Sequence, residues 1–131
     1  MDNIVSALSQ KNRTSLRKLL IICCISVAYA LFGFIGDLFT DQASEATAIW
    51  PSSGIALASC LIWGRSASLG VFIGAFIINA WLGFDLTSYQ SIFRSTLVVS
   101  IISFGAALQA LAGHFLVIKF SGQDSLFQSS A

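Results

Sequence analysis

The sequence predicts an all-helical, polytopic membrane protein whose bundle has four transmembrane spans. Hydrophobic residues make up 56% of the 131-residue chain and only 10% of its residues are charged, against about 25% in a soluble domain. The mean hydropathy is +0.82. A helix needs roughly 20 apolar residues to cross a hydrocarbon core of about 30 Å. Four apolar segments suit this role: residues 19–39, 47–63, 67–84 and 91–118.

The first span, residues 19–39, follows a polar leader, residues 1–18, which we expect to be a mobile cytoplasmic segment. A cleaved signal peptide is the alternative, because basic residues, an apolar run and Ala28-Tyr29-Ala30 resemble its three parts. The apolar run continues to Ile35, however, and this spanning length favours a retained helix.

The second span contains a proline and two serines at a depth where a lipid environment disfavours both a broken helix and polar side chains. The sequence there is Trp50, Pro51, Ser52, Ser53 and Gly54. Pro51 lacks an N–H and leaves a carbonyl about one turn earlier without its helical partner. If the helix restarts at Ser52, the amides of Ser52, Ser53 and Gly54 would face an outer cavity and could bind an anion or a polar group. An ordinary proline kink is the alternative.

The third span, residues 67–84, is separated from the second by a short turn around Arg65, so the two helices should be antiparallel neighbours. Gly70 and Gly74 form a G-x-x-x-G step that lets another helix approach closely. Asn79 is an amide at membrane depth and needs hydrogen-bond partners, either on a neighbouring helix or in a polar pocket. Because Pro51 and Asn79 are equally distant from Arg65 along the chain, they should lie at similar depth.

The fourth span, residues 91–118, is the longest and should tilt or emerge at its Ser91 end. It carries two stripes of small and polar residues, which we expect to pack against protein. A four-span chain does not fully supply partners for the first of these stripes and for Gly70 and Gly74, so we predict self-association or rapid turnover in cells. The first stripe is Thr96, Ser100, Ser103, Ala107, Ala110 and His114, and the second is Gly105, Gln109 and Gly113.

Basic residues fall on one predicted side of the membrane and acidic residues on the other. The first group is Lys11, Arg13, Arg17, Lys18, Arg65 and Lys119; the second is Asp37, Asp41, Glu45 and Asp85, with Arg94 beside it. The positive-inside rule therefore places both termini, including the polar tail 120–131, in the cytoplasm.

Several function classes find no support in the sequence. A net charge of +1 gives no basic face for nucleic acid. We find no Gly-rich phosphate loop, no nucleophile and base around the single histidine, and no metal-ligand spacing, so no enzyme, cofactor or metal site is expected. Cys23, Cys24 and Cys60 are interpreted as small buried residues.

One block of the chain resembles a known family. The run Ile49–Ala58, the turn Trp63-Gly64-Arg65, the step Gly70–Gly74 and Asn79 resemble the first type of MASE domain, the bacterial membrane-associated sensor family. Leu108–Gly113 is also similar to this family, and the similarity covers roughly residues 15–120.

The resemblance implies a sensory input domain of about eight spans in the bacterial inner membrane, followed by a histidine kinase or cyclic-di-GMP output module. With four spans and no output module, the chain is expected to be the N-terminal half of such a domain, as a fragment, a truncated form or a subunit that works with another chain. The expected signal is an unidentified small molecule at Trp50, Pro51, Ser52, Ser53, Gly54 and Asn79.

Two alternatives stay open. A small four-helix multidrug exporter fits the length, but proton coupling requires an acidic residue in mid-membrane, and the only Asp or Glu within a span, Asp37, lies at an edge. A nonfunctional remnant is the other.

The topology can be tested with reporter fusions. Fusions after Gln42, Arg65, Thr87 and Gln123 should report outside, inside, outside and inside, because the basic segments stay in the cytoplasm. A cytoplasmic signal after Gln42 would contradict this topology.

Overall fold

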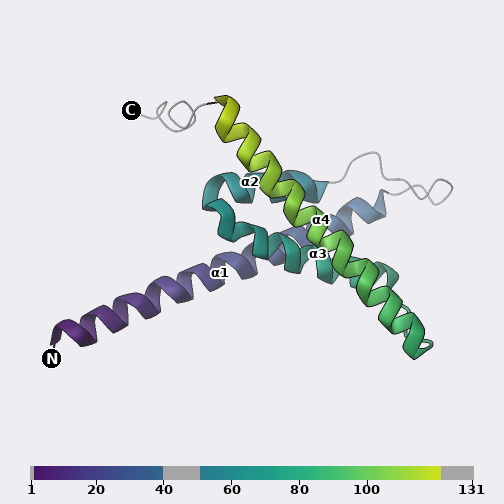
Figure 1. The fold of residues 1–131 in the computed structure, drawn as a ribbon, viewed down its shortest axis with the longest axis horizontal. Helices are drawn as coiled ribbons and strands as arrows, with labels where there is room; N and C mark the ends of the chain where they lie inside the picture. The colour runs from purple at the N-terminus through teal and green to yellow at the C-terminus, as the bar shows by residue number, and fades with distance from the viewer. Residues whose placement is uncertain (1, 40–50, 122–131) are drawn as a thin grey trace.

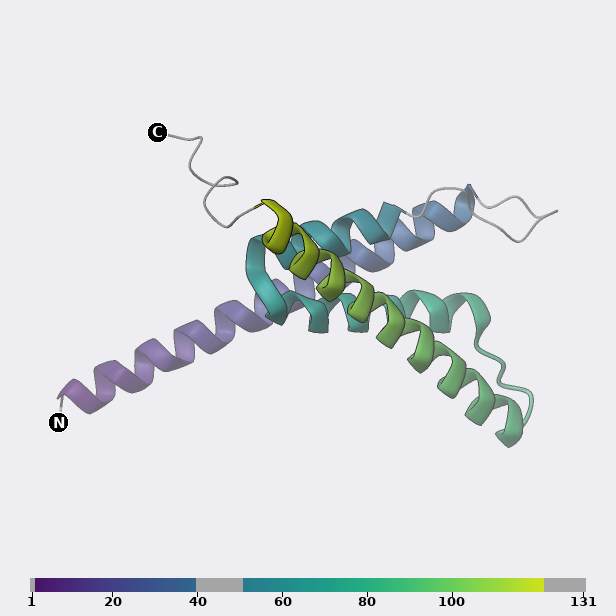
Figure 2. The same cartoon turned by 45° about the horizontal axis from the view of Figure 1, so that its top comes forward.

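The computed structural model describes residues 2–39 and 51–121. This part of the chain is all-helical. In chain order it contains α1 (Asp2–Leu38), α2 (Pro51–Trp63), the 3₁₀ turn η1 (Gly64–Ser66), α3 (Ala67–Gly83) and α4 (Tyr89–Ser121). α1 passes behind the other helices, α2 and α3 form a hairpin closed by η1, and α4 crosses over that hairpin (Figures 1 and 2).

Three helical stretches are long and apolar enough to cross a membrane: Asn12–Leu38, Pro51–Gly83 and Tyr89–Ser121. The middle stretch is not one straight helix, because α2 and α3 run in opposite directions on either side of η1 (Figure 2). The 13 described residues of α2 reach only about 20 Å at 1.5 Å per residue, which is short of a hydrocarbon core. Four separate spans therefore stay a prediction.

The turn between α2 and α3 depends on a glycine. Gly64 has φ +71°, a conformation that residues with a Cβ rarely adopt. The hydroxyl of Ser66 donates to the Trp63 carbonyl at 3.2 Å, and the hydroxyl of Ser68 donates to the Arg65 carbonyl at 2.7 Å. These bonds hold the tight reversal that makes α2 and α3 neighbours.

α1 and α3 pack with almost no space between their backbones. A Cβ added at Gly70 would lie 2.9 Å from the Ile22 carbonyl oxygen, and one at Gly74 would lie 2.7 Å from the Ser26 carbonyl oxygen. The Ser26 hydroxyl lies 2.8 Å from the Ile22 carbonyl oxygen and 3.0 Å from that of Gly70, so its proton can be shared between the two helices. Ile25, Tyr29, Val71, Ala75 and Ile78 surround this contact and form most of the buried core.

Residues 2–18 of the polar leader are helical and continue α1 without a break. The cytoplasmic location of this segment stays a prediction. Leucine, lysine and arginine in residues 16–20 are good helix formers, and a helix already nucleated in the apolar span propagates at little cost.

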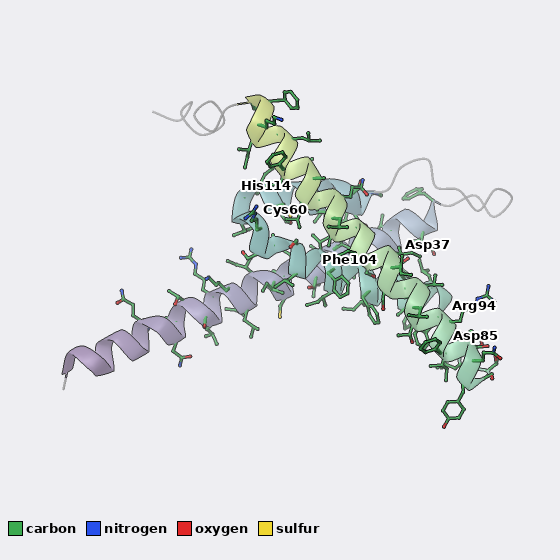
Figure 3. All side chains as sticks on the ribbon, in the orientation of Figure 1. Asp37, Cys60, Asp85, Arg94, Phe104 and His114 are labelled. Atoms are coloured by element: carbon green, nitrogen blue, oxygen red, sulfur yellow. The ribbon has the colours of Figure 1, made fainter. Side chains whose placement is uncertain are left out.

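The charged residues gather at the two ends of the bundle. At one end, Arg17 and Lys18 of α1 line a shallow groove together with Trp63 and Ser66, and Lys119 lies 6.0 Å from the centre of the Phe115 ring. Asp37, Asp85 and Arg94 lie toward the opposite end (Figure 3).

The loop before α4 is ordered by Asp85. The backbone N–H and the hydroxyl of Thr87 donate to Asp85 Oδ1 at 2.9 Å and 2.7 Å. These bonds, led by that of the Thr87 hydroxyl, lower the pKa of Asp85 below its ordinary value. Their stabilising effect is present above the ordinary pKa of an aspartate and is lost as the pH falls through the lowered pKa.

The close contact of α1 and α3 predicts the effect of a single methyl group. Gly74→Ala should destabilise the protein by about 1–3 kcal/mol, because the methyl group overlaps α1. Thermal unfolding in mild detergent measures this. Gly83→Ala is the matched control, since its Cβ would meet no atom within 4 Å; equal melting temperatures for the two variants would refute the contact.

Candidate functional site: a polar groove between the helices

An open groove of about 560 Å³ lies where all four helices approach one another. Its size is within the range of small-molecule sites. α1 contributes one lining residue, α3 one, and α2 and α4 the others. The groove is lined by Tyr29, Ser53, Gly54, Ala56, Leu57, Asn79, Ile102, Gly105, Ala106, Gln109, Ala110 and Gly113.

Half of the residues proposed from sequence as a ligand site line this groove. Ser53 and Gly54 come from α2 and Asn79 from α3, and the hairpin brings them together. Ser52 does not line it: its side chain is buried against α1, where its hydroxyl donates to the Tyr29 carbonyl at 3.2 Å. Pro51 is half-buried outside the groove, and Trp50 lies outside the described residues.

Ser52 turns away from the groove because of helical geometry. Successive side chains on a helix differ by about 100° in direction, so those of Ser52 and Ser53 cannot both face one cavity. The Ser52 hydroxyl instead stabilises the contact between α1 and α2. The backbone amides of a first helical turn point along the helix axis, so the expectation that those of Ser52, Ser53 and Gly54 bind a polar group stays a prediction.

The groove places a few polar side chains among mostly apolar lining residues, and none of its described lining side chains is charged. Asn79 Nδ2 donates to the Ala75 carbonyl at 2.8 Å within its own helix, which leaves the amide oxygen to accept another bond. Gln109 is exposed and makes no hydrogen bond within the described part of the chain. Two amides without full partners, facing a neutral groove, suit an uncharged hydrogen-bonding occupant.

The glycines of the bundle serve two different purposes. Gly33, Gly70, Gly74 and Gly113 each lie against a neighbouring helix, so a Cβ there would meet atoms at 2.7 to 3.1 Å. Gly54 and Gly105 lie on the groove, and a Cβ at either would meet nothing within 4 Å. These two glycines are not required by packing inside the chain, but they widen the groove.

A second groove of about 430 Å³ continues from the first toward the end of the bundle that carries Asp85. The two grooves share Asn79 and Ile102, and together they follow α4 from Ser91 to Gly113. Asp85 and Arg94 line the second groove, and Arg94 forms no ion pair with any described residue. Asn79 thus lies at the junction of a neutral groove and a charged one.

The centre of the first stripe of α4 packs inside the chain, whereas Thr96 is exposed. Ser103, Ala107 and Ala110 are buried, and the Ser103 hydroxyl donates to the Val99 carbonyl at 2.7 Å. Gly70 and Gly74 of α3 likewise pack against α1, whose atoms occupy the space beside these two glycines. Within the described chain, α1, α2 and α3 thus supply partners to much of these seams, and self-association stays a prediction. The second stripe is open at Gly105 and Gln109, and only Gly113 contacts another helix, through Leu57.

The cysteines and the histidine form no site with one another. Cys60 is buried as expected, but Cys23 and Cys24 are exposed, because the packed face of α1 passes through Ile25, Ser26 and Tyr29 instead. His114 Nδ1 is buried without a hydrogen-bond partner in the described chain. No group of three His, Cys, Asp or Glu residues could hold a metal among the described residues.

Comparison of the chain with models of protein families, with curated proteins and with solved structures finds no match. The resemblance to the membrane-associated sensor family therefore rests on the motif residues alone.

The sequence did not indicate several lining residues of the two grooves, among them Tyr29, Arg94, Leu57 and Ile102. Tyr29 is almost fully buried in α1, and its role depends on the packing of α1 against α3. The sequence marks Arg94 as an isolated cation close to the end of the fourth span. That Arg94 and Asp85 line the same groove follows only from the folded structure.

Access to the groove can be measured by thiol labelling after Cys23, Cys24 and Cys60 are replaced by Ala. Asn79→Cys should react with a water-soluble thiol reagent faster than Ile77→Cys, which lies on the same helix and is exposed outside both grooves. Equal labelling of the two cysteines in membranes would show that the groove holds no water.

Proposed function

We propose that this chain is a membrane-embedded sensory input domain of a bacterial signal-transduction protein, and that its signal is a small molecule bound in the neutral groove. The observation that carries the proposal is the convergence of Ser53, Gly54 and Asn79 on one groove. These are motif residues of the family that the sequence resembles, and the fold brings them together from separate helices.

The groove lies where binding could alter helix packing. α3 is held against α1 by glycine contacts, whereas α4 faces the groove through Gly105 and Gln109. An occupant that hydrogen-bonds to Asn79 and Gln109 would favour one position of α4 relative to α3. A ligand shifts such an equilibrium by its difference in affinity for the two states.

The proposal includes four spans in the inner membrane and two cytoplasmic termini. The basic residues around Arg17 and Lys18 lie beside the hairpin turn, which supports a common cytoplasmic side. A histidine kinase or a cyclic-di-GMP module attached at that side would receive the signal, either in the same polypeptide or in a partner. The alternative of a proton-coupled exporter gains no support from the neutral groove, whose described lining contains no carboxylate.

The proposal predicts that groove residues control signalling independently of folding. The chain, fused at its C-terminus to a diguanylate cyclase reporter, should lose most of its condition-dependent output when Asn79→Leu removes the amide, while membrane abundance stays normal. The cyclic-di-GMP level across growth conditions is the measurement.

Thr96→Ala is the control, because the Thr96 hydroxyl is exposed, bonds only to the Ile92 carbonyl of its own helix and lines neither groove. Retained signalling in Asn79→Leu and in Ser53→Ala, with both variants present at normal levels, would refute the sensory site.

A further inference from the structure

A continuous face of α4 has no partner in the described chain. The two grooves together follow α4 from Ser91 to Gly113, a length of about 33 Å at 1.5 Å per residue. This is slightly more than the thickness of a hydrocarbon core, which is about 30 Å. A face of this length suits a complete transmembrane helix, in addition to any small molecule held at Asn79.

The exposed residues along this face recur at spacings of three or four, which keeps them on one side of a helix. We name them the α4 face: Arg94, Val98, Ile102, Gly105, Gln109, Ala112 and Leu116. All seven are exposed, whereas the first stripe packs inward at Ser103, Ala107 and Ala110.

The centre of the α4 face is unsuited to lipid. Gln109 presents an amide without a hydrogen-bond partner among the described residues, and lipid tails offer none. Gly105 lies near the middle of α4, and its missing side chain serves no contact within the chain. A polar amide one turn from an open glycine is the combination that draws two membrane helices together.

We propose that the α4 face binds the α4 face of a second copy of this chain, in a parallel two-fold dimer. Two copies inserted in the same orientation are related by an axis along the membrane normal, so each residue meets its counterpart at the same depth. An amide has both donors and an acceptor, so Gln109 and the partner's Gln109 satisfy each other. Facing glycines at position 105 let the two backbones approach.

The charges at one end of the face fit the same arrangement. Arg94 projects from the end of α4 near Asp85 (Figure 3), and both residues line one groove without forming an ion pair together. In the dimer Arg94 lies beside the partner's α4, where the partner's Asp85 offers a carboxylate. This exchange offsets the repulsion between the two arginines. A self-complementary amide and self-complementary charges favour a second copy over an unrelated helix.

The dimer shares Gln109 with the proposed ligand groove, so a cross-linking test that leaves Gln109 unchanged decides the dimer separately from the sensory role. The test uses single cysteines in a chain whose Cys23, Cys24 and Cys60 are replaced by Ala, oxidised in native membranes. Val98→Cys and Ala112→Cys, on the α4 face, should form disulfide-linked dimers at least 10-fold faster than Leu97→Cys and Phe115→Cys. The latter two are exposed on the adjacent side of α4.

A second measurement addresses the amide pair by single-molecule photobleaching in bilayers. Gln109→Leu should lower the dimer fraction several-fold, and Gln109→Asn should retain most of it. Equal cross-linking at all four positions, preferential cross-linking at Leu97 and Phe115, or cross-linking to a different protein would overturn the proposal. An unchanged dimer fraction in Gln109→Leu would also overturn it. Loss of dimerisation with intact signalling would leave the sensory site standing.

Discussion

The close approach of α1 and α3 is the contact on which the rest of the bundle depends. Gly70 and Gly74 bring α3 against the backbone of α1, and the Ser26 hydroxyl reaches the Gly70 carbonyl across this interface. In a membrane the hydrophobic effect gives little drive for helix association, so dispersion contacts and interhelical hydrogen bonds must supply it. α1 and α3 thus form the closely packed part of the protein, and the Ser52 hydroxyl of α2 donates a hydrogen bond to α1.

Because α1 and α3 are closely packed, α4 has one side that packs against the bundle and one side that faces the groove. Its inward side packs through Ser103, Ala107 and Ala110, whereas Gly105 and Gln109 face the groove. Small residues therefore have two different roles within α4. Ser103, Ala107 and Ala110 allow another helix to pack closely, whereas Gly105 leaves open space in the groove. On one side of the groove lies α3, which carries Asn79 and is packed against α1. On the other side lies α4, which has open space beside Gly105 and Gln109.

Much of this arrangement can be predicted from the sequence, but which helix packs against which stripe of small residues cannot. The helical class, the turn at Arg65 and the meeting of Ser53 with Asn79 follow from hydrophobic length and spacing. Sequence spacing cannot say which helix fills a small-residue stripe. Gly70 and Gly74 are consequently satisfied by α1, while the stripe of Gly105 and Gln109 stays largely open. The outward direction of Cys23 and Cys24 likewise depends on which face of α1 meets α3.

The most direct test is the distance between α1 and α3 in the unmodified protein. Nuclear Overhauser effects between the Gly74 α-protons and the Tyr29 β-protons, measured on selectively labelled protein in detergent micelles, report it. A Cβ at Gly74 would lie only 2.8 Å from Tyr29 Cβ, so a strong effect is predicted, together with one between Gly70 and Ile25. Absence of both effects in folded protein, or a register in which Gly70 contacts Tyr29, would contradict the packing that places Asn79 in the groove.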